Sequence, residues 1–265
     1  LNVVLNTVLA SFLAQGSISF LYYADRLVQF PLGVFGLAVS TAALPSLSTL
    51  LADNRKAEFA HTLRSTVDLV LFISLPATAG LMALNTPMVD VLFGRGAFDG
   101  GAVQATAGAV VGYALGLPAF CAVRSLVSAL YALEDTRSPV WAAVVSLVIN
   151  VLLGLGLMQL MGHVGLAVAV SLASWGNLFL LARALNRHIG RWFQIQRPLL
   201  RVVALSCLLG LLCSLTASWG WLSLAAIPVW AGAYMAAARM LQIPEAEMVL
   251  SGVRSTLRAR HSDAR

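Results

Sequence analysis

The sequence predicts an all-α membrane protein of about eight transmembrane helices, the first of them truncated. One observation is composition: 59% of the 265 residues are hydrophobic, only 11% are charged, and the mean hydropathy is +0.85. Ordinary soluble domains carry about 25% charged residues. The other observation is the length of the apolar segments. Several of them reach the roughly 20 residues that a helix needs to cross a bilayer. Lipid is therefore the predicted solvent for most of the chain.

The predicted elements follow one another along the whole chain. Residues 1–15 resemble the end of a truncated helix, and full spans are predicted near 17–50, 65–93, 102–131, 138–161, 164–185, 199–217 and 220–241. The first full span is too long for one straight helix, and Pro31, Gly33 and Gly36 predict a kink or break near its middle. Because Leu1 is not a methionine and no signal-peptide pattern precedes it, we expect a fragment of a longer protein.

Basic residues alternate between the two sides of the predicted bundle. The loops near 51–64, 134–138 and 183–201 and the tail from 239 together contain 14 of the 17 lysines and arginines, whereas the alternate loops contain only Arg95. This bias predicts that the arginine-rich loops and the C-terminus are cytoplasmic. The net charge of +6 suits contact with an anionic leaflet. No nucleic-acid partner is predicted, because the arginines are dispersed among the spans.

Arg26 is a charged residue inside an apolar segment, where it costs about 2.5–3.5 kcal/mol on insertion scales. It follows Gly16 by about ten residues, which places it roughly 15 Å deep. Asp25 points about 100° away from it. Helical spacing brings a polar set onto one face, as in the wall of a hydrated cavity: Ser19, Tyr22, Arg26, Gln29 and Gly33. Two interpretations stay open for Arg26. Its guanidinium binds a phosphate or carboxylate substrate through two hydrogen bonds, or it forms an ion pair with a carboxylate on another helix.

Three other features have a structural and a functional interpretation. Arg124 lies nearer the cytoplasmic end of its span, where snorkelling is cheap, so both roles stay open. The glycines at 108, 112 and 116 predict close helix packing within the chain, with dimerisation as the alternative. Asn150, in the middle of a span, is expected to bond a neighbouring helix rather than an ion.

The sequence does not predict an enzyme or a cofactor. It contains no evident nucleophile with a base, no phosphate-binding glycine loop and no metal-ligand spacing. Cys121, Cys207 and Cys213 lie in apolar stretches and are expected to be small core residues.

Two stretches carry a resemblance to a known family. Residues 6–17, the run from Tyr22 to Gly33 and Leu44-Pro-Ser-Leu-Ser48 resemble the MurJ (MviN) family of lipid II flippases. The loop from Tyr131 to Pro139 is similar to one shared more widely among multidrug/oligosaccharidyl-lipid/polysaccharide exporters. The resemblance covers essentially the whole chain and corresponds to the C-terminal half of a two-lobe exporter.

The resemblance implies a domain organisation and a function. Residues 1–190 would form a six-helix transporter lobe, 191–243 two additional transmembrane helices that help to hold the lipid tail, and 244–265 a cytoplasmic basic tail. The substrate would be a polyprenyl-pyrophosphate-linked saccharide-peptide, flipped to the periplasmic leaflet of the bacterial inner membrane for peptidoglycan and cell-wall synthesis. The missing N-terminal lobe would complete the cavity, so the chain alone is expected to be inactive. The family's cavity arginine falls at Arg26, and the candidate substrate-binding residues are Arg26, Asp25, Gln29, Tyr22 and Arg124.

Departures from the family pattern and rival functions also follow from the residues. Some relatives have acidic residues where Asn6 and Gly154 stand, so a sodium site is not predicted here. The nearest rival function is flipping of another polyprenyl-linked saccharide, of O-antigen or capsule type. A drug or cation antiporter should place carboxylates at membrane depth, whereas this chain places Arg26 there with Asp25 as its only deep acidic neighbour. A membrane scaffold without transport activity is the remaining alternative.

Overall fold

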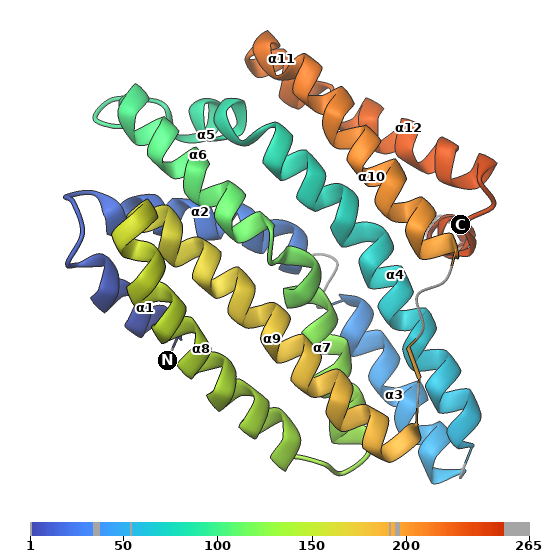
Figure 1. Cartoon of the computed structure of the whole chain (residues 1–265). Helices are drawn as coiled ribbons and strands as arrows, with labels where there is room; N and C mark the ends of the chain where they lie inside the picture. The colour runs from blue at the N-terminus through green and yellow to red at the C-terminus, as the bar shows by residue number, and fades with distance from the viewer. Residues whose placement is uncertain (1, 34–37, 54, 191, 194–196, 252–265) are drawn as a thin grey trace, which may run out of the picture.

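The computed structural model describes residues 2–33, 38–53, 55–190, 192–193 and 197–251, and within them it contains helices and no strand (Figure 1). The helices are α1 (Asn2–Ala10), α2 (Ser17–Pro31), α3 (Ala38–Ala52), α4 (Lys56–Ala83), α5 (Asn85–Phe93), α6 (Gly100–Ala114), α7 (Leu117–Ala132), α8 (Arg137–Met161), α9 (His163–Ile189), α10 (Arg197–Thr216), α11 (Trp221–Ala225) and α12 (Ile227–Met240). The order confirms the all-α prediction.

Five of the described helical segments are long and apolar enough to cross a membrane: α4, α8, α9, 197–219 and 221–240. The pair α6–α7 also passes as one span bent by 41°. Helices α2 and α3 are 15 residues each and occupy the two halves of the predicted broken span. Residues 34–37, which include the predicted break at Gly36, lie outside the described part.

One predicted span differs from the structure at its start and in its interior. The expected span 65–93 is two helices, and α4 already begins at Lys56. The chain turns after Leu84, where the Asn85 side chain donates to the Met82 carbonyl at 2.5 Å and Pro87 lies in the first turn of α5. Because proline is well tolerated in a first turn and poorly in a helix interior, a second helix starts here.

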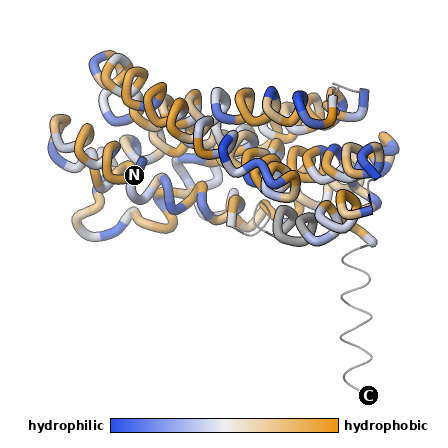
Figure 2. The backbone as a smooth tube through the Cα atoms, turned by 90° about the horizontal axis from the view of Figure 1, so that it is seen from below, coloured by the Kyte–Doolittle hydropathy of each residue, from blue (hydrophilic) through white to orange (hydrophobic). Residues whose placement is uncertain are grey.

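The helices pack around three apolar clusters in the described part. One joins α2, α6 and the start of α9, a second joins the start of α4 to the ends of α7 and α9, and a third joins α4 to α10 and α12. Large apolar side chains also remain exposed along α8, α9 and α10. Figure 2 shows apolar stretches running along most helices, with many hydrophilic stretches near helix ends. Such apolar outer faces fit contact with lipid.

The glycine repeat on α6 forms a seam with α9. A Cβ added at Gly108 would lie 3.1 Å from the Val164 side chain, and one at Gly112 would lie 2.8 Å from the Ala167 Cβ. The Ser171 hydroxyl donates to the Gly112 carbonyl at 2.7 Å across the same seam. The predicted close packing within the chain is therefore confirmed.

Asn150 bonds a neighbouring helix, as the sequence predicts. Its amide nitrogen donates to the side-chain oxygens of Asn2 at 3.0 Å and Asn6 at 3.2 Å. These partly buried bonds connect α8 to α1. Gly154, one turn further along α8, faces Leu9 and Leu166 closely.

Helices α10 and α12 pack beside α4, on the side of the bundle opposite α8 (Figure 1). Pro76 has no N–H, so it leaves the carbonyl of Phe72, four residues earlier in α4, without its helical partner. The Tyr234 hydroxyl of α12 donates to this carbonyl at 2.9 Å, and its ring lies 5.2 Å from the Phe72 ring. The domain boundaries at 190 and 243 stay predictions; residues 244–251 are helical, and 252–265 lie outside the described part.

Replacing Tyr234 with phenylalanine is expected to lower the free energy of unfolding by about 1–3 kcal/mol, because a buried carbonyl loses its only described side-chain donor while the ring stays. The same change at the exposed Tyr131 is the matched control and should have no measurable effect. Unfolding of both variants in detergent, followed by loss of helicity, checks this. Equal stability of the two variants would mean that Tyr234 contributes only through its ring.

Candidate functional site

Helix α2 is positioned by one buried edge. Leu21, Ala24 and Val28 are buried, and α2 packs mainly against α6. The opposite edge is exposed and contains the polar set that helical spacing predicts: Ser19, Tyr22, Arg26, Gln29 and Gly33. The predicted polar face is therefore present and points away from the bundle core.

Arg26 is held by residues of its own helix. Its guanidinium donates to the Tyr22 hydroxyl at 3.3 Å and to the Gln29 side-chain oxygen at 3.4 Å. The guanidinium carbon also lies 4.9 Å from the centre of the Tyr22 ring, a cation–π distance. The Gln29 amide in turn donates to the half-buried Asp25 carboxylate. Tyr22, Gln29 and Asp25 thus form one polar chain that orients the guanidinium.

Within the described residues, no carboxylate of another helix pairs with Arg26. The ion pairs found there are Arg55–Glu58, Arg64–Asp68 and His188–Asp135. The interpretation of Arg26 as half of an interhelical ion pair therefore finds no support in the described part. Both of its hydrogen bonds are long, so an incoming anion can replace them at little cost.

The arrangement suits the binding of a phosphate or carboxylate. A guanidinium presents several donors in a planar fork that matches two oxygens of such a group. Charge-assisted bonds of this kind are about twice as strong as neutral ones. The chemistry available on this face is thus anion recognition.

Arg124 lies elsewhere. Its helix, α7, packs mainly against α4, α9 and α3, whereas α2 packs mainly against α6. The Arg124 side chain is half-buried, and it takes no part in the hydrogen bonds that form the polar chain around Arg26. Its proposed contact with substrate stays a prediction.

The structure has a recess beside α2 that the sequence did not predict. A volume of about 800 Å³ opens between the start of α2 and the α5–α6 loop. Tyr23 stacks there, with its ring centre 4.7 Å from that of Phe93 and 5.5 Å from that of Phe98. Arg95 lies on the rim and donates to backbone carbonyls at the end of α5. The sequence feature that could have indicated this recess is the glycine-rich run 94–101, with Phe93 just before it and Phe98 within it.

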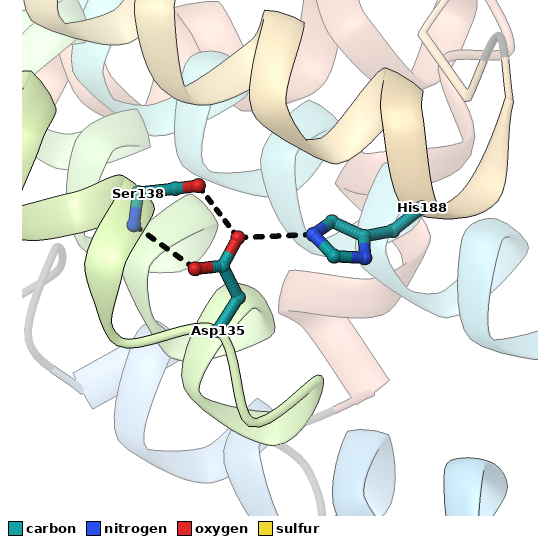
Figure 3. Close-up of polar contacts among 3 residues, drawn as sticks. All are labelled: Asp135, Ser138 and His188. Atoms are coloured by element: carbon teal, nitrogen blue, oxygen red, sulfur yellow. Dashed lines mark hydrogen bonds and ion pairs between the residues drawn. The ribbon is translucent and has the colours of Figure 1, made fainter.

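The sequence also did not predict a cluster of three polar residues between α7, α8 and α9 (Figure 3). Asp135 precedes α8 and accepts from the Ser138 N–H at 2.9 Å and the Ser138 hydroxyl at 2.6 Å. The His188 ring near the end of α9 lies 2.9 Å from the same carboxylate. The Ser138 hydroxyl and, to a smaller extent, His188 lower the pKa of Asp135 from 3.8 to about 2.

This cluster predicts a specific loss of stability in acid. Because the folded pKa of Asp135 lies below its unfolded value, its contribution is fully present above about pH 4 and disappears as the pH falls towards about 2. We expect a loss on the order of 1 kcal/mol, since screening near water weakens such interactions. The unfolding midpoints of wild type and Asp135→Asn should therefore converge as the pH falls from about 5 to about 2. A constant difference across this range would contradict the assignment.

These observations define a class of protein: a multi-pass helical membrane protein with an arginine on an exposed polar face. The family described as "Lipid II flippase MurJ" matches residues 1–238. The chain belongs to the MurJ family.

Individual relatives agree with this assignment. The chain is 38% identical over 229 residues to "Probable lipid II flippase MurJ" of Vibrio cholerae, covering 83% of the chain and 44% of the relative. It is 35% identical over 221 residues to the protein of the same description in Rhizobium meliloti, covering 83% and 41%. The chain thus spans less than half the length of these curated relatives.

Solved structures give the same fold. The structure titled "Lipid II flippase MurJ, inward closed conformation" superposes with a TM-score of 0.77 at 26% identity, over 91% of this chain and 51% of that one. A transporter of the MOP superfamily from Pyrococcus furiosus superposes with a TM-score of 0.52 at 17% identity, which shows the fold alone.

Proposed function

We propose that this chain forms one lobe of a lipid II flippase, which moves a lipid-linked peptidoglycan precursor from the cytoplasmic to the periplasmic leaflet. The second lobe corresponds to the half of the relatives that the chain does not match. We refer to the assembly of both as the two-lobe protein. The chain alone is inactive in this proposal, because it supplies one wall of the cavity.

The observation that carries the proposal is the exposed Arg26 on α2. A pyrophosphate is a dense anion, and a guanidinium binds it with two parallel hydrogen bonds. Tyr22, Gln29 and Asp25 orient Arg26 without neutralising it through an ion pair. An arginine exposed on a helix between apolar flanks suits a water-filled cavity shared with the second lobe.

The mechanism follows from the different solubility of the two ends of such a substrate, a polar headgroup and an apolar tail. The saccharide-peptide headgroup and pyrophosphate cross through the hydrated cavity, while the polyprenyl tail stays in lipid. Rocking of two lobes about a fixed site exposes that site to one leaflet and then to the other. The arginine-rich loops face the cytoplasm in this scheme.

Sodium coupling is not part of the proposal. Asn6 and Asn150 bond one another, and Gly154 packs against apolar side chains, so this region offers no carboxylate to a cation. Within the described residues, no group of three or more histidine, cysteine, aspartate or glutamate side chains is placed to hold a metal ion. The absence of a cofactor stays a prediction.

Complementation separates the proposal from its nearest rival. The two-lobe protein is expressed in cells depleted of their own lipid II flippase and, separately, in cells that lack an O-antigen flippase. We expect growth and periplasmic exposure of lipid II in the first strain only. Restored polysaccharide export without lipid II exposure would overturn the assignment of substrate.

A further inference from the structure

A groove between α8 and α9 lies far from the Arg26 face. It has a volume of about 190 Å³ and lies where α8 begins and α9 ends. The Phe20 ring of α2 contacts His163 at the other end of α9, with ring centres 5.5 Å apart. Since Arg183 follows His163 by twenty residues, the groove is about 30 Å away along the helix.

Two arginines lie one turn apart at this groove. Arg183 and Arg187 both line it and are exposed. In the described part of the chain, no carboxylate forms an ion pair with either side chain. The Asp135 carboxylate, which contacts the end of α9, is occupied by Ser138 and His188 (Figure 3). Two guanidinium groups are therefore available to one external anion.

Apart from Ser138, whose hydroxyl bonds Asp135, the rest of the groove is apolar or aromatic. Ala142 and Val145 of α8 and Leu180 and Ala184 of α9 form its walls. Trp141 lies at the same mouth with 65% of its surface exposed. Exposed tryptophans of membrane proteins concentrate at the level of the lipid headgroups. The groove thus joins a cationic mouth to an apolar channel between two spanning helices.

The Asp135 cluster fixes the shape of this mouth. Asp135 lies just before α8, Ser138 is in its first turn, and His188 is near the end of α9, so their bonds hold the two helix ends together. A site whose walls are fixed before binding loses less conformational entropy when a ligand enters.

We propose that this groove binds an anionic phospholipid of the cytoplasmic leaflet, with the phosphodiester between Arg183 and Arg187 and one acyl chain between α8 and α9. Basic pockets between spanning helices on the cytoplasmic side hold such headgroups. A soluble phosphate would use the arginines but gain nothing from the apolar walls. The orientation is the one given by the loop charges.

Lipid retention by the purified chain tests the proposal. The chain is prepared in mild detergent with either dioleoylphosphatidylglycerol or dioleoylphosphatidylcholine, and bound lipid is counted by native mass spectrometry. We expect preferential binding of the first phosphatidylglycerol molecule. Arg183→Gln/Arg187→Gln should weaken that binding about tenfold while leaving phosphatidylcholine unchanged.

The matched control removes the same charge elsewhere on the predicted cytoplasmic side. Arg197→Gln/Arg239→Gln changes two exposed arginines outside the groove and should bind like wild type. Helicity confirms that each variant folds. Equal loss in both double variants, no loss in either, or displacement of the lipid by millimolar inorganic phosphate would overturn the proposal.

Discussion

Replacing Arg26 with lysine in the two-lobe protein is expected to reduce lipid II translocation by about tenfold or more, and replacing it with alanine to abolish it. Lysine keeps the charge but cannot form two parallel bonds to a pyrophosphate. Loss of one strong charge-assisted bond of about 1.5–3 kcal/mol accounts for a tenfold effect. Because Arg26 is exposed on α2 and, among the described residues, bonds only to its own helix, both variants should fold.

Translocation is measured by the accessibility of a fluorescent lipid II analogue in vesicles, at matched protein content. Arg239→Lys is the control, since Arg239 is exposed at the end of α12, away from α2. Full activity of Arg26→Ala would favour the scaffold alternative. Full activity of Arg26→Lys with an inactive alanine variant would show that charge alone suffices.

Replacing Gly112 with leucine is expected to destabilise the chain by about 2 kcal/mol or more, through overpacking of the α6–α9 seam. Even a Cβ at this position would lie 2.8 Å from the Ala167 Cβ and 3.3 Å from the backbone of α9. Backbone atoms cannot move aside as a flexible side chain can. The helices must therefore separate, which also breaks the bond from Ser171 to the Gly112 carbonyl.

Gly156→Leu is the control for the same change of size. Gly156 is exposed on α8, and nothing lies within 4 Å of an added Cβ. This variant should be as stable as wild type or slightly more so, because leucine favours a helix over glycine by up to about 1 kcal/mol. Detergent-solubilised chains are compared by thermal loss of helicity. A stable Gly112→Leu variant would mean that the seam adapts.

The sequence predicted the features that depend on local spacing. The polar face of α2 and the glycine seam follow from helical periodicity, and both lie where the pattern places them. Arg26 stood out because a charge in an apolar span is costly. Its own hydrogen-bond partners, Tyr22 and Gln29, are four and three residues away, so a single helix suffices to predict them.

The features that the sequence missed depend on contacts between distant segments. Tyr234 satisfies a carbonyl freed by Pro76, but their helices meet only in the folded chain, and the bond joins residues 162 apart. Asp135 and His188 meet across 53 residues for the same reason. The early start of α4 at Lys56 was missed because its first turns are polar, whereas the predicted boundary followed hydropathy.

Photo-crosslinking to lipid II tests most directly whether the Arg26 face of α2 lines the substrate path. Benzoylphenylalanine replaces either Tyr22, an exposed aromatic residue beside Arg26, or Phe179, an exposed aromatic residue on α9. In cells expressing the two-lobe protein, the account predicts a covalent adduct carrying the pyrophosphate-linked headgroup at Tyr22 and none at Phe179. An adduct at Phe179 alone, or equal adducts at both positions, would contradict it.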